Sequence, residues 1–140
     1  MKKLTILKIA QTGNLTFNIC DSYFRTYNIP PSCPLILELL NDKDNIPLKM
    51  LKEATHKDSG SITSSINTLE KDGFVKRNRN EQDKRSFLIT ITPKGRETVK
   101  IIKAYHEKIE NISLMDFTDE EKEQLTEFMV RIESNLEKMK

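Results

Sequence analysis

The chain of 140 residues has little glycine and proline, and it contains no long hydrophobic run. Its four glycines and five prolines form no tract that would mark a flexible linker, and the sequence has no internal repeat. No apolar segment approaches the roughly 20 residues that a membrane-spanning helix needs. These absences predict one domain over residues 1–140 that lies in the cytoplasm and does not contact a membrane.

Cysteine and histidine are also scarce. The two cysteines, Cys20 and Cys33, are too few for a disulfide framework, and the sequence has no Cys-x-x-Cys or His-x₃-His pair. His106 and Glu110 stand four residues apart and could share a metal ion, but a structural or surface histidine is the commoner situation. We therefore predict packed, reduced thiols, no metal and no cofactor. The alternative, a thiol enzyme, would need a nucleophile–base pair or a phosphate loop that the sequence does not show.

The charges are distributed unevenly, although the net charge is only +2. Residues 49–100 hold 12 Lys and Arg against 7 Asp and Glu, whereas residues 101–140 hold 6 against 10. A basic middle and an acidic end indicate that one part of the chain meets an anion and the other does not.

Hydrophobic periodicity predicts a mainly α-helical chain with one small β-hairpin. Helices are expected over residues 14–27, 33–40, 47–55, 58–72 and 93–113, and after a capping box that begins at Thr118. Either Asp58 or Ser59 is expected to cap the helix that runs to Asp72. Strands are expected over residues 74–77 and 87–91, on either side of a polar tip. Two short helices followed directly by a hairpin are typical of a winged helix-turn-helix.

Two local features refine this prediction. Ser32 is expected to cap the helix at 33–40, and the buried stripe of that helix is expected to be Leu35, Ile36, Leu39 and Leu40. Gly73 is expected to end the helix at 58–72, because glycine readily adopts the left-handed conformation of a C-terminal cap.

The helix before Gly73 is the candidate for contact with DNA. Ile62, Ile66 and Leu69 lie on one side of it and are expected to face the core. The candidate DNA contacts on this helix are Ser59, Gly60, Thr63, Ser64, Asn67 and Lys71. A helix fits the major groove of B-DNA, where Asn67 could pair with an adenine edge and Lys71 with a phosphate. The alternative is that these residues form the solvated side of an amphipathic helix.

Three stretches resemble the MarR family of winged-helix transcriptional regulators. Residues 62–77 resemble its recognition helix and first wing strand, residues 83–86 its Asp-x-Arg wing signature, and residues 88–96 its passage into the next helix. The match covers residues 30–100 in order and spacing, and the flanking helices match in position and length. The chain departs from many relatives in having Ser and Thr on the recognition helix where Arg is frequent.

The resemblance implies roles for the charged hairpin. It implies that Arg85 enters the minor groove, whose negative potential rewards an inserted arginine, and that Asp83 orients this side chain. The further phosphate contacts expected are Lys76, Arg77, Arg79 and Lys84. The alternative is a solvated, charged hairpin tip. Because the candidate recognition helix comes directly before the hairpin, we favour DNA contact.

The resemblance also implies a homodimer, with residues 1–28 and 101–140 as dimerisation helices and residues 29–100 as the winged helix-turn-helix. A two-fold dimer reads an inverted-repeat operator in double-stranded DNA, with half-sites roughly 34–36 Å apart. The candidate interface residues on the last helix are Leu125, Phe128, Met129, Ile132 and Leu136, an apolar stripe spaced for helix packing. Packing within one chain is the alternative.

A small-molecule effector is the last partner that the resemblance implies, in a cleft between the dimerisation helices and the winged helix. Candidate lining residues are Tyr23, Phe24, Arg25 and Tyr27, although aromatic residues at helical spacing also form cores. Neither cysteine matches the peroxide-sensing cysteine of the family. The sequence thus predicts a homodimeric repressor that binds specific double-stranded DNA and is released by a small molecule or another signal. The alternative is a winged-helix protein-interaction module without specific DNA binding.

Overall fold

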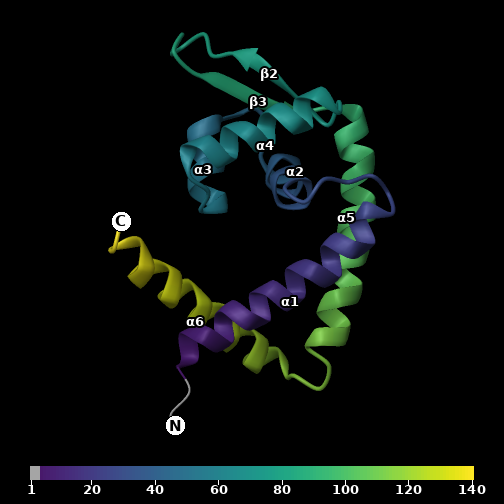
Figure 1. Cartoon of the computed structure of the whole chain (residues 1–140), viewed down its shortest axis with the longest axis vertical. Helices are drawn as coiled ribbons and strands as arrows, with labels where there is room; N and C mark the ends of the chain where they lie inside the picture. The colour runs from purple at the N-terminus through teal and green to yellow at the C-terminus, as the bar shows by residue number, and fades with distance from the viewer. Residues whose placement is uncertain (1–3) are drawn as a thin grey trace. The chain divides into compact units, whose positions relative to one another are not determined.

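The computed structural model describes residues 4–140 (Figure 1). The elements of this part of the chain are α1 (Thr5–Arg25), α2 (Cys33–Asp42), β1 (Ile46–Pro47), α3 (Leu48–Thr55), α4 (Ser59–Lys71), β2 (Val75–Arg79), β3 (Phe87–Ile91), α5 (Pro93–Ser113) and α6 (Asp119–Glu137). Six helices and a small antiparallel sheet confirm the predicted fold class, mainly helical with a β-hairpin wing. The chain divides into two compact units, one ending at His106 and one from Glu107 to Lys140.

The sheet of the first unit has the strand order β1-β3-β2, and both pairs are antiparallel. β2 and β3 form the predicted hairpin, with Val75 opposite Ile91 and Arg79 opposite Phe87. The hairpin projects beyond the short helices (Figure 1). The strand β1 was not predicted; it adds only Ile46 and Pro47 to the free edge of β3. This short strand joins the start of α3 to the wing.

The core of the first unit lies among α2, α3, α4, the sheet and the first half of α5. Its fully buried side chains include Ile36, Leu37, Leu40, Leu51, Ile62, Ile66, Leu69, Ile89 and Ile102. Burying each such side chain stabilises the fold by about 1.5–3 kcal/mol before the entropy cost is counted. The predicted inward side of α4, formed by Ile62, Ile66 and Leu69, is confirmed.

The ends of α4 follow the local signals of the sequence. The Asp58 side chain caps the helix by accepting a 2.7 Å hydrogen bond from the Ser61 backbone N–H. At the other end Gly73 has a φ of 84°, a left-handed conformation that glycine adopts without steric cost. The Phe74 N–H then donates to the Leu69 carbonyl at 2.9 Å, which closes the helix and starts the wing. The predicted stop at Gly73 is confirmed.

Two predictions for α2 are wrong. Ser32 makes no side-chain capping bond, and the Cys33 N–H donates instead to the Pro30 carbonyl at 3.0 Å, so the preceding turn supplies the acceptor. Leu35 is 48% exposed, whereas Leu37 is fully buried. The buried residues Cys33, Ile36, Leu37 and Leu40 are spaced i, i+3, i+4 and i+7, so Leu35 falls outside the inward stripe.

α1 is longer than the predicted helix at 14–27, since it begins at Thr5 and continues through Gly13. Only Phe24 of this helix is buried. The apolar residues Leu15, Phe17 and Ile19 are 62%, 51% and 45% exposed. The last turn of α1 therefore packs on the core, and the rest presents an apolar surface that this chain leaves uncovered within its first unit.

The start of α5 is fixed against the wing. The Thr92 hydroxyl accepts from the Gly95 N–H at 3.0 Å and donates to the Gly73 carbonyl at 2.6 Å, which confirms Thr92 as a helix start. A Cβ atom at position 95 would lie 2.4 Å from the Phe74 carbonyl oxygen and 2.6 Å from Ile91 Cγ1. Only glycine lets the helix approach the hairpin this closely.

The second unit contains the end of α5 and all of α6. The predicted capping box is confirmed, because the Thr118 N–H donates to Glu121 Oε1 at 2.9 Å and the Glu121 N–H donates to Thr118 Oγ1 at 3.1 Å. No residue of α6 is buried. From residue 4 onward, no helix combines the length and the apolar character that crossing a membrane would require.

Candidate nucleic-acid interface

One side of α4 is exposed along its whole length. Ser59, Gly60, Thr63, Ser64, Asn67 and Lys71 all lie on it, opposite the buried residues of the helix. These are the six residues that the sequence predicted as DNA contacts on this helix. A Cβ atom at Gly60 would meet only Asp58 Oδ1, at 3.6 Å, so packing does not require glycine there. The exposed side of α4 is therefore polar, and the buried apolar residues of the helix lie on its other side.

Three side chains join α4 to the first wing strand. The Arg77 guanidinium donates from Nη1 to Glu70 Oε1 at 2.5 Å and from Nη2 to Asn67 Oδ1 at 2.5 Å. The Arg77 backbone N–H also donates to Glu70 Oε2, at 3.1 Å. The Arg77 side chain is only 21% exposed. Glu70 and Asn67 of α4 therefore already hold the guanidinium of Arg77, which the sequence predicted as a phosphate contact.

The wing tip is closed by hydrogen bonds from its own polar residues. Asp83 Oδ1 accepts from the Arg85 backbone N–H at 3.1 Å, and the Asp83 carbonyl accepts from the Ser86 N–H at 3.1 Å. Asn80 Nδ2 donates to Ser86 Oγ at 3.1 Å across the tip. Asp83 thus holds the backbone at Arg85 through this hydrogen bond. Lys76, Arg79, Lys84 and Arg85 are all exposed.

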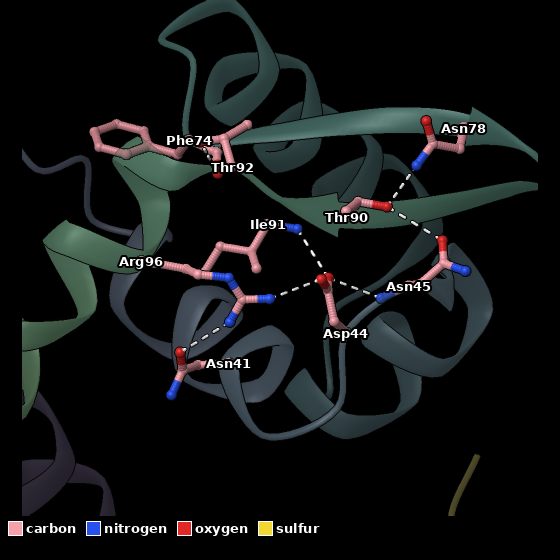
Figure 2. Close-up of polar contacts among 9 residues, drawn as sticks. All are labelled: Asn41, Asp44, Asn45, Phe74, Asn78, Thr90, Ile91, Thr92 and Arg96. Atoms are coloured by element: carbon pink, nitrogen blue, oxygen red, sulfur yellow. Dashed lines mark hydrogen bonds and ion pairs between the residues drawn. The ribbon is translucent and has the colours of Figure 1, made fainter.

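A polar network around Asp44 connects the turn before β1 to β3 and α5 (Figure 2). Asp44 Oδ1 accepts from the Ile91 N–H at 2.9 Å and from the Asn45 N–H at 2.8 Å. Asp44 Oδ2 accepts from Arg96 Nη2 at 3.0 Å, and Arg96 Nη1 reaches Asn41 Oδ1 at 3.5 Å. The network holds the wing and the helix-turn-helix in one fixed arrangement.

The four residues predicted to line an effector cleft differ in their surroundings. Phe24 is 2% exposed and belongs to the core of the first unit. Tyr23 stacks on Tyr105 with 3.7 Å between ring centroids, and Arg25 Nε donates to Asp21 at 2.7 Å. Tyr27 is 48% exposed, and its hydroxyl lies 3.3 Å from that of Tyr23.

A different cavity lies between α1 and α4. It has a volume of about 280 Å³ and is lined by Phe17, Pro30, Pro31, Ser32, Lys57, Ser64, Ser65 and Thr68. Lys57 is the charged residue in this lining. Ser64 and Thr68 belong to α4, so a molecule in the cavity would touch the candidate recognition helix.

The two thiols and His106 take structural places. Cys33 is fully buried, and this burial raises the pKa of its thiol to about 12; burial also raises the pKa of Cys20. Both positions fit the prediction of packed thiols. His106 Nδ1 lies 3.0 Å from Glu38 Oε1, so Glu38 is its carboxylate partner in place of Glu110. Over residues 4–140 no group of three or more potential ligands is placed to hold a metal ion.

Comparison with known proteins decides the family. The model of the family described as "Transcriptional regulator SarA/Rot" matches residues 25–102, more than half of the chain. The chain belongs to the SarA/Rot family of transcriptional regulators. The matched region runs from the end of α1 to the middle of α5 and contains α4 and the wing. The activity assigned by this membership is the regulation of transcription.

Individual relatives of the chain are also named as transcriptional regulators. The chain is 29% identical over 105 residues to the HTH-type transcriptional regulator SarZ of Staphylococcus epidermidis, covering 75% of this chain and 70% of SarZ. It is 31% identical over 107 residues to the HTH-type transcriptional regulator BilQ of Clostridium symbiosum, covering 76% of this chain and 74% of BilQ.

Solved structures confirm the MarR-type winged-helix fold of this SarA/Rot member. A MarR protein from Peptoclostridium difficile superposes with a TM-score of 0.89 at 23% identity, covering 99% of this chain and 93% of that protein. A MarR family regulator from Listeria monocytogenes, in complex with a 26mer DNA, gives a TM-score of 0.89 at 22% identity. The superposition covers 97% of this chain and 90% of that protein.

Sequence reasoning missed three residues that shape the interface. Glu70 was not singled out, although a carboxylate seven residues before Arg77 across a helix stop is a usable signal. Asp44 and Arg96 were also missed, since they meet over a separation of 52 residues and no local pattern links them.

Proposed function

We propose that this SarA/Rot family member is a sequence-specific double-stranded DNA-binding regulator that works as a homodimeric repressor. Within it, residues 29–100 would bind DNA, and residues 1–28 and 101–140 would form the dimer. The observation that carries the proposal is the exposed polar side of α4 next to an exposed basic wing. Both surfaces lie outside the hydrophobic core of this chain.

The exposed side of α4 suits the major groove of DNA. Its hydroxyl, amide and ammonium groups can all donate to base edges or phosphates. The free space at Gly60 supports a functional reason for glycine, because a missing side chain at a helix start lets a phosphate approach the backbone N–H groups.

The wing suits a neighbouring minor groove. Arg85 is exposed at the tip, and Asp83 fixes its backbone. A narrow minor groove concentrates negative potential, which attracts such an arginine. Lys76, Arg79 and Lys84 add positive charge around the same hairpin and would contact phosphates.

An apolar helix surface supports the homodimer. On α6, Phe128, Met129 and Leu136 are 53%, 38% and 48% exposed, and Leu125 and Ile132 are half-buried. A contiguous apolar stripe on a soluble monomer is unfavourable unless a partner covers it. A second copy with two-fold symmetry would cover both stripes and place two recognition helices on an inverted repeat.

A small molecule that enters the cavity between α1 and α4 would be a suitable releasing signal. Lys57 would attract an anionic group, and the cavity wall includes Ser64 of the recognition helix. Isothermal titration with a panel of aromatic acids tests this part of the proposal. The absence of heat above dilution for the whole panel would contradict it.

The main experiment is selection from a pool of randomised duplex DNA at two salt concentrations, followed by sequencing of the retained fraction. We expect enrichment of an inverted repeat and an affinity that falls steeply as salt rises, because bound phosphates release counterions. Weak, salt-insensitive retention without enrichment would contradict DNA binding and favour the protein-interaction alternative.

A further inference from the structure

We propose that Arg77 determines which base Asn67 reads, by holding the Asn67 oxygen and leaving only amide N–H donors for the DNA. Each operator half-site would then carry guanine, and not adenine, at the position that Asn67 contacts. This inference rests on the proposed DNA-binding function and corrects the adenine contact that the sequence suggested for Asn67.

Chemistry fixes the orientation of the Asn67 side chain. A guanidinium has five N–H donors and no acceptor, so the amide atom that faces Arg77 must be the oxygen. Arg77 Nη2 donates to Asn67 Oδ1, and the charge on the guanidinium strengthens this hydrogen bond. The Asn67 nitrogen, with its two N–H groups, is left to face other partners.

Glu70 keeps Arg77 in this position. Its two carboxylate oxygens accept from the Arg77 side chain and from the Arg77 backbone N–H. The guanidinium is thus held on two sides, by residues that lie three positions apart on α4, and its side chain is only 21% exposed. Freeing Asn67 Oδ1 would break part of this arrangement.

The two purines require different hydrogen-bonding groups from an asparagine side chain. Adenine presents the N7 acceptor and the N6 donor, so its paired contact needs both the oxygen and the nitrogen of the amide. Guanine presents the acceptors N7 and O6 and needs donors only. An Asn67 whose oxygen is held by Arg77 matches guanine, and it would have to leave Arg77 to make the paired contact with adenine.

The experiment starts from the selected operator and compares the wild-type chain with Asn67→Ala. The base position whose preference disappears in Asn67→Ala is the one that Asn67 reads. At this position we expect wild-type chain to bind guanine about tenfold or more tightly than adenine, the size of discrimination that one good contact gives. Replacing this guanine by 7-deazaguanine should weaken wild-type binding and leave Asn67→Ala binding unchanged, because the analogue lacks the N7 acceptor.

Two variants test the role of Arg77. In Arg77→Ala the Asn67 oxygen is free, and we expect the preference at the same position to move toward adenine. Lys71→Ala is the matched control on the same helix side, since loss of a phosphate contact should weaken binding to all sequences without changing base preference. Thermal melts of all three variants show whether each one is folded.

The outcomes separate this inference from the function on which it rests. An enriched inverted repeat with adenine at the Asn67 position, or with no position sensitive to Asn67→Ala, overturns the inference and leaves the DNA-binding function intact. No enrichment of any sequence overturns both. If Arg77→Ala does not fold, the guanine preference and the 7-deazaguanine result of the wild-type chain still decide the question.

Discussion

Arg96 of α5 and Asp44 of the turn before β1 form an ion pair with 3.0 Å between Nη2 and Oδ2, although 52 residues separate them in the chain. Asp44 also accepts from the backbone N–H groups of Ile91 and Asn45 (Figure 2). One carboxylate therefore ties the helix-turn-helix to the wing and to the long helix that follows it.

Removing this carboxylate should destabilise the fold. We expect Asp44→Ala to lower the free energy of unfolding by about 2 kcal/mol, because the N–H of the buried residue Ile91 loses its acceptor. Urea unfolding followed by circular dichroism measures the change. Asp42→Ala is the matched control, since Asp42 is exposed and ends α2 nearby. Equal losses in the two variants would contradict a special role for Asp44.

Two glycines should respond in opposite directions to the same change. Gly95→Ala should lower the free energy of unfolding by about 2 kcal/mol, because its Cβ would collide with backbone and Ile91. Gly13→Ala should raise it by about 0.5–1 kcal/mol, because Gly13 lies within α1 with nothing within 4 Å of a new Cβ. Melting of both variants side by side tests the close approach of α5 to the wing. A harmless Gly95→Ala would refute it.

Arg85 should matter for DNA and not for stability. We expect Arg85→Ala to weaken operator binding about tenfold or more, the value of one charge-assisted contact, and to change the free energy of unfolding by less than about 0.5 kcal/mol. Fluorescence anisotropy with labelled operator and a thermal melt give the two numbers. Lys138→Ala, which removes an exposed cation after α6, should change neither. A large drop in melting temperature would make Arg85 structural.

The apolar stripe of α6 should hold the dimer. We expect Ile132→Glu and Leu125→Glu to weaken the dimer at least about a hundredfold, because each would bury an unpaired carboxylate. Analytical ultracentrifugation over a concentration series measures the dissociation constant.

Val130→Glu is the matched control for these variants. It makes the same kind of change at a residue that is 57% exposed, about 140° around the helix from Leu125. Loss of the dimer in Val130→Glu but not in the other two would move the interface to the opposite side of α6.

Cys33 should be unreactive while the chain is folded. With a pKa of about 12, its thiolate fraction at pH 8 is about one in ten thousand. We expect iodoacetamide to label Cys33 only after unfolding in urea, as read by mass spectrometry, and to label the half-buried Cys20 earlier. Rapid labelling of Cys33 in the folded chain would contradict its burial.

The same pKa shift links Cys33 to pH-dependent stability. The pKa of the Cys33 thiol is higher in the folded state than in the unfolded state. The contribution of the neutral thiol to the free energy of unfolding is therefore fully present below the ordinary thiol pKa, and it is lost as the pH rises toward 12. Between pH 8 and 10.5 the wild-type chain should lose stability more steeply than Cys33→Ala. Parallel pH profiles for the two chains would contradict the shift.

Local signals predicted much of the fold. Several helix ends depend only on local features. Gly73 ends α4 through its own φ angle, and Thr92 and the pair Thr118–Glu121 start helices through hydrogen bonds to residues three positions away. The local sequence therefore contains the whole signal. The face of α4 was predictable for the same reason, since Ile62, Ile66 and Leu69 repeat at the helix period.

Features that depend on tertiary pairing were not predictable. β1 has only two residues and no periodicity, and it is a strand because Ile46 meets Ile89. Choosing between Leu35 and Leu37 as the buried residue of α2 requires knowing which direction the core lies in. Arg77 was recognised as a cation, but its binding by Glu70 and Asn67 depends on how the turn at Gly73 folds the strand back beside the helix.

The close contact at Gly95 limits how this sequence can change over evolution. Connections between a strand and a helix usually accept insertions and deletions, because they lie on the surface and pack loosely. Here one added or lost residue between Ile91 and Gly95 would bring a side chain to the place where a Cβ atom would lie 2.4 Å from the Phe74 oxygen. The length of this connection should therefore stay constant among relatives that keep the same wing, while the polar tip at residues 80–86 remains free to vary in length.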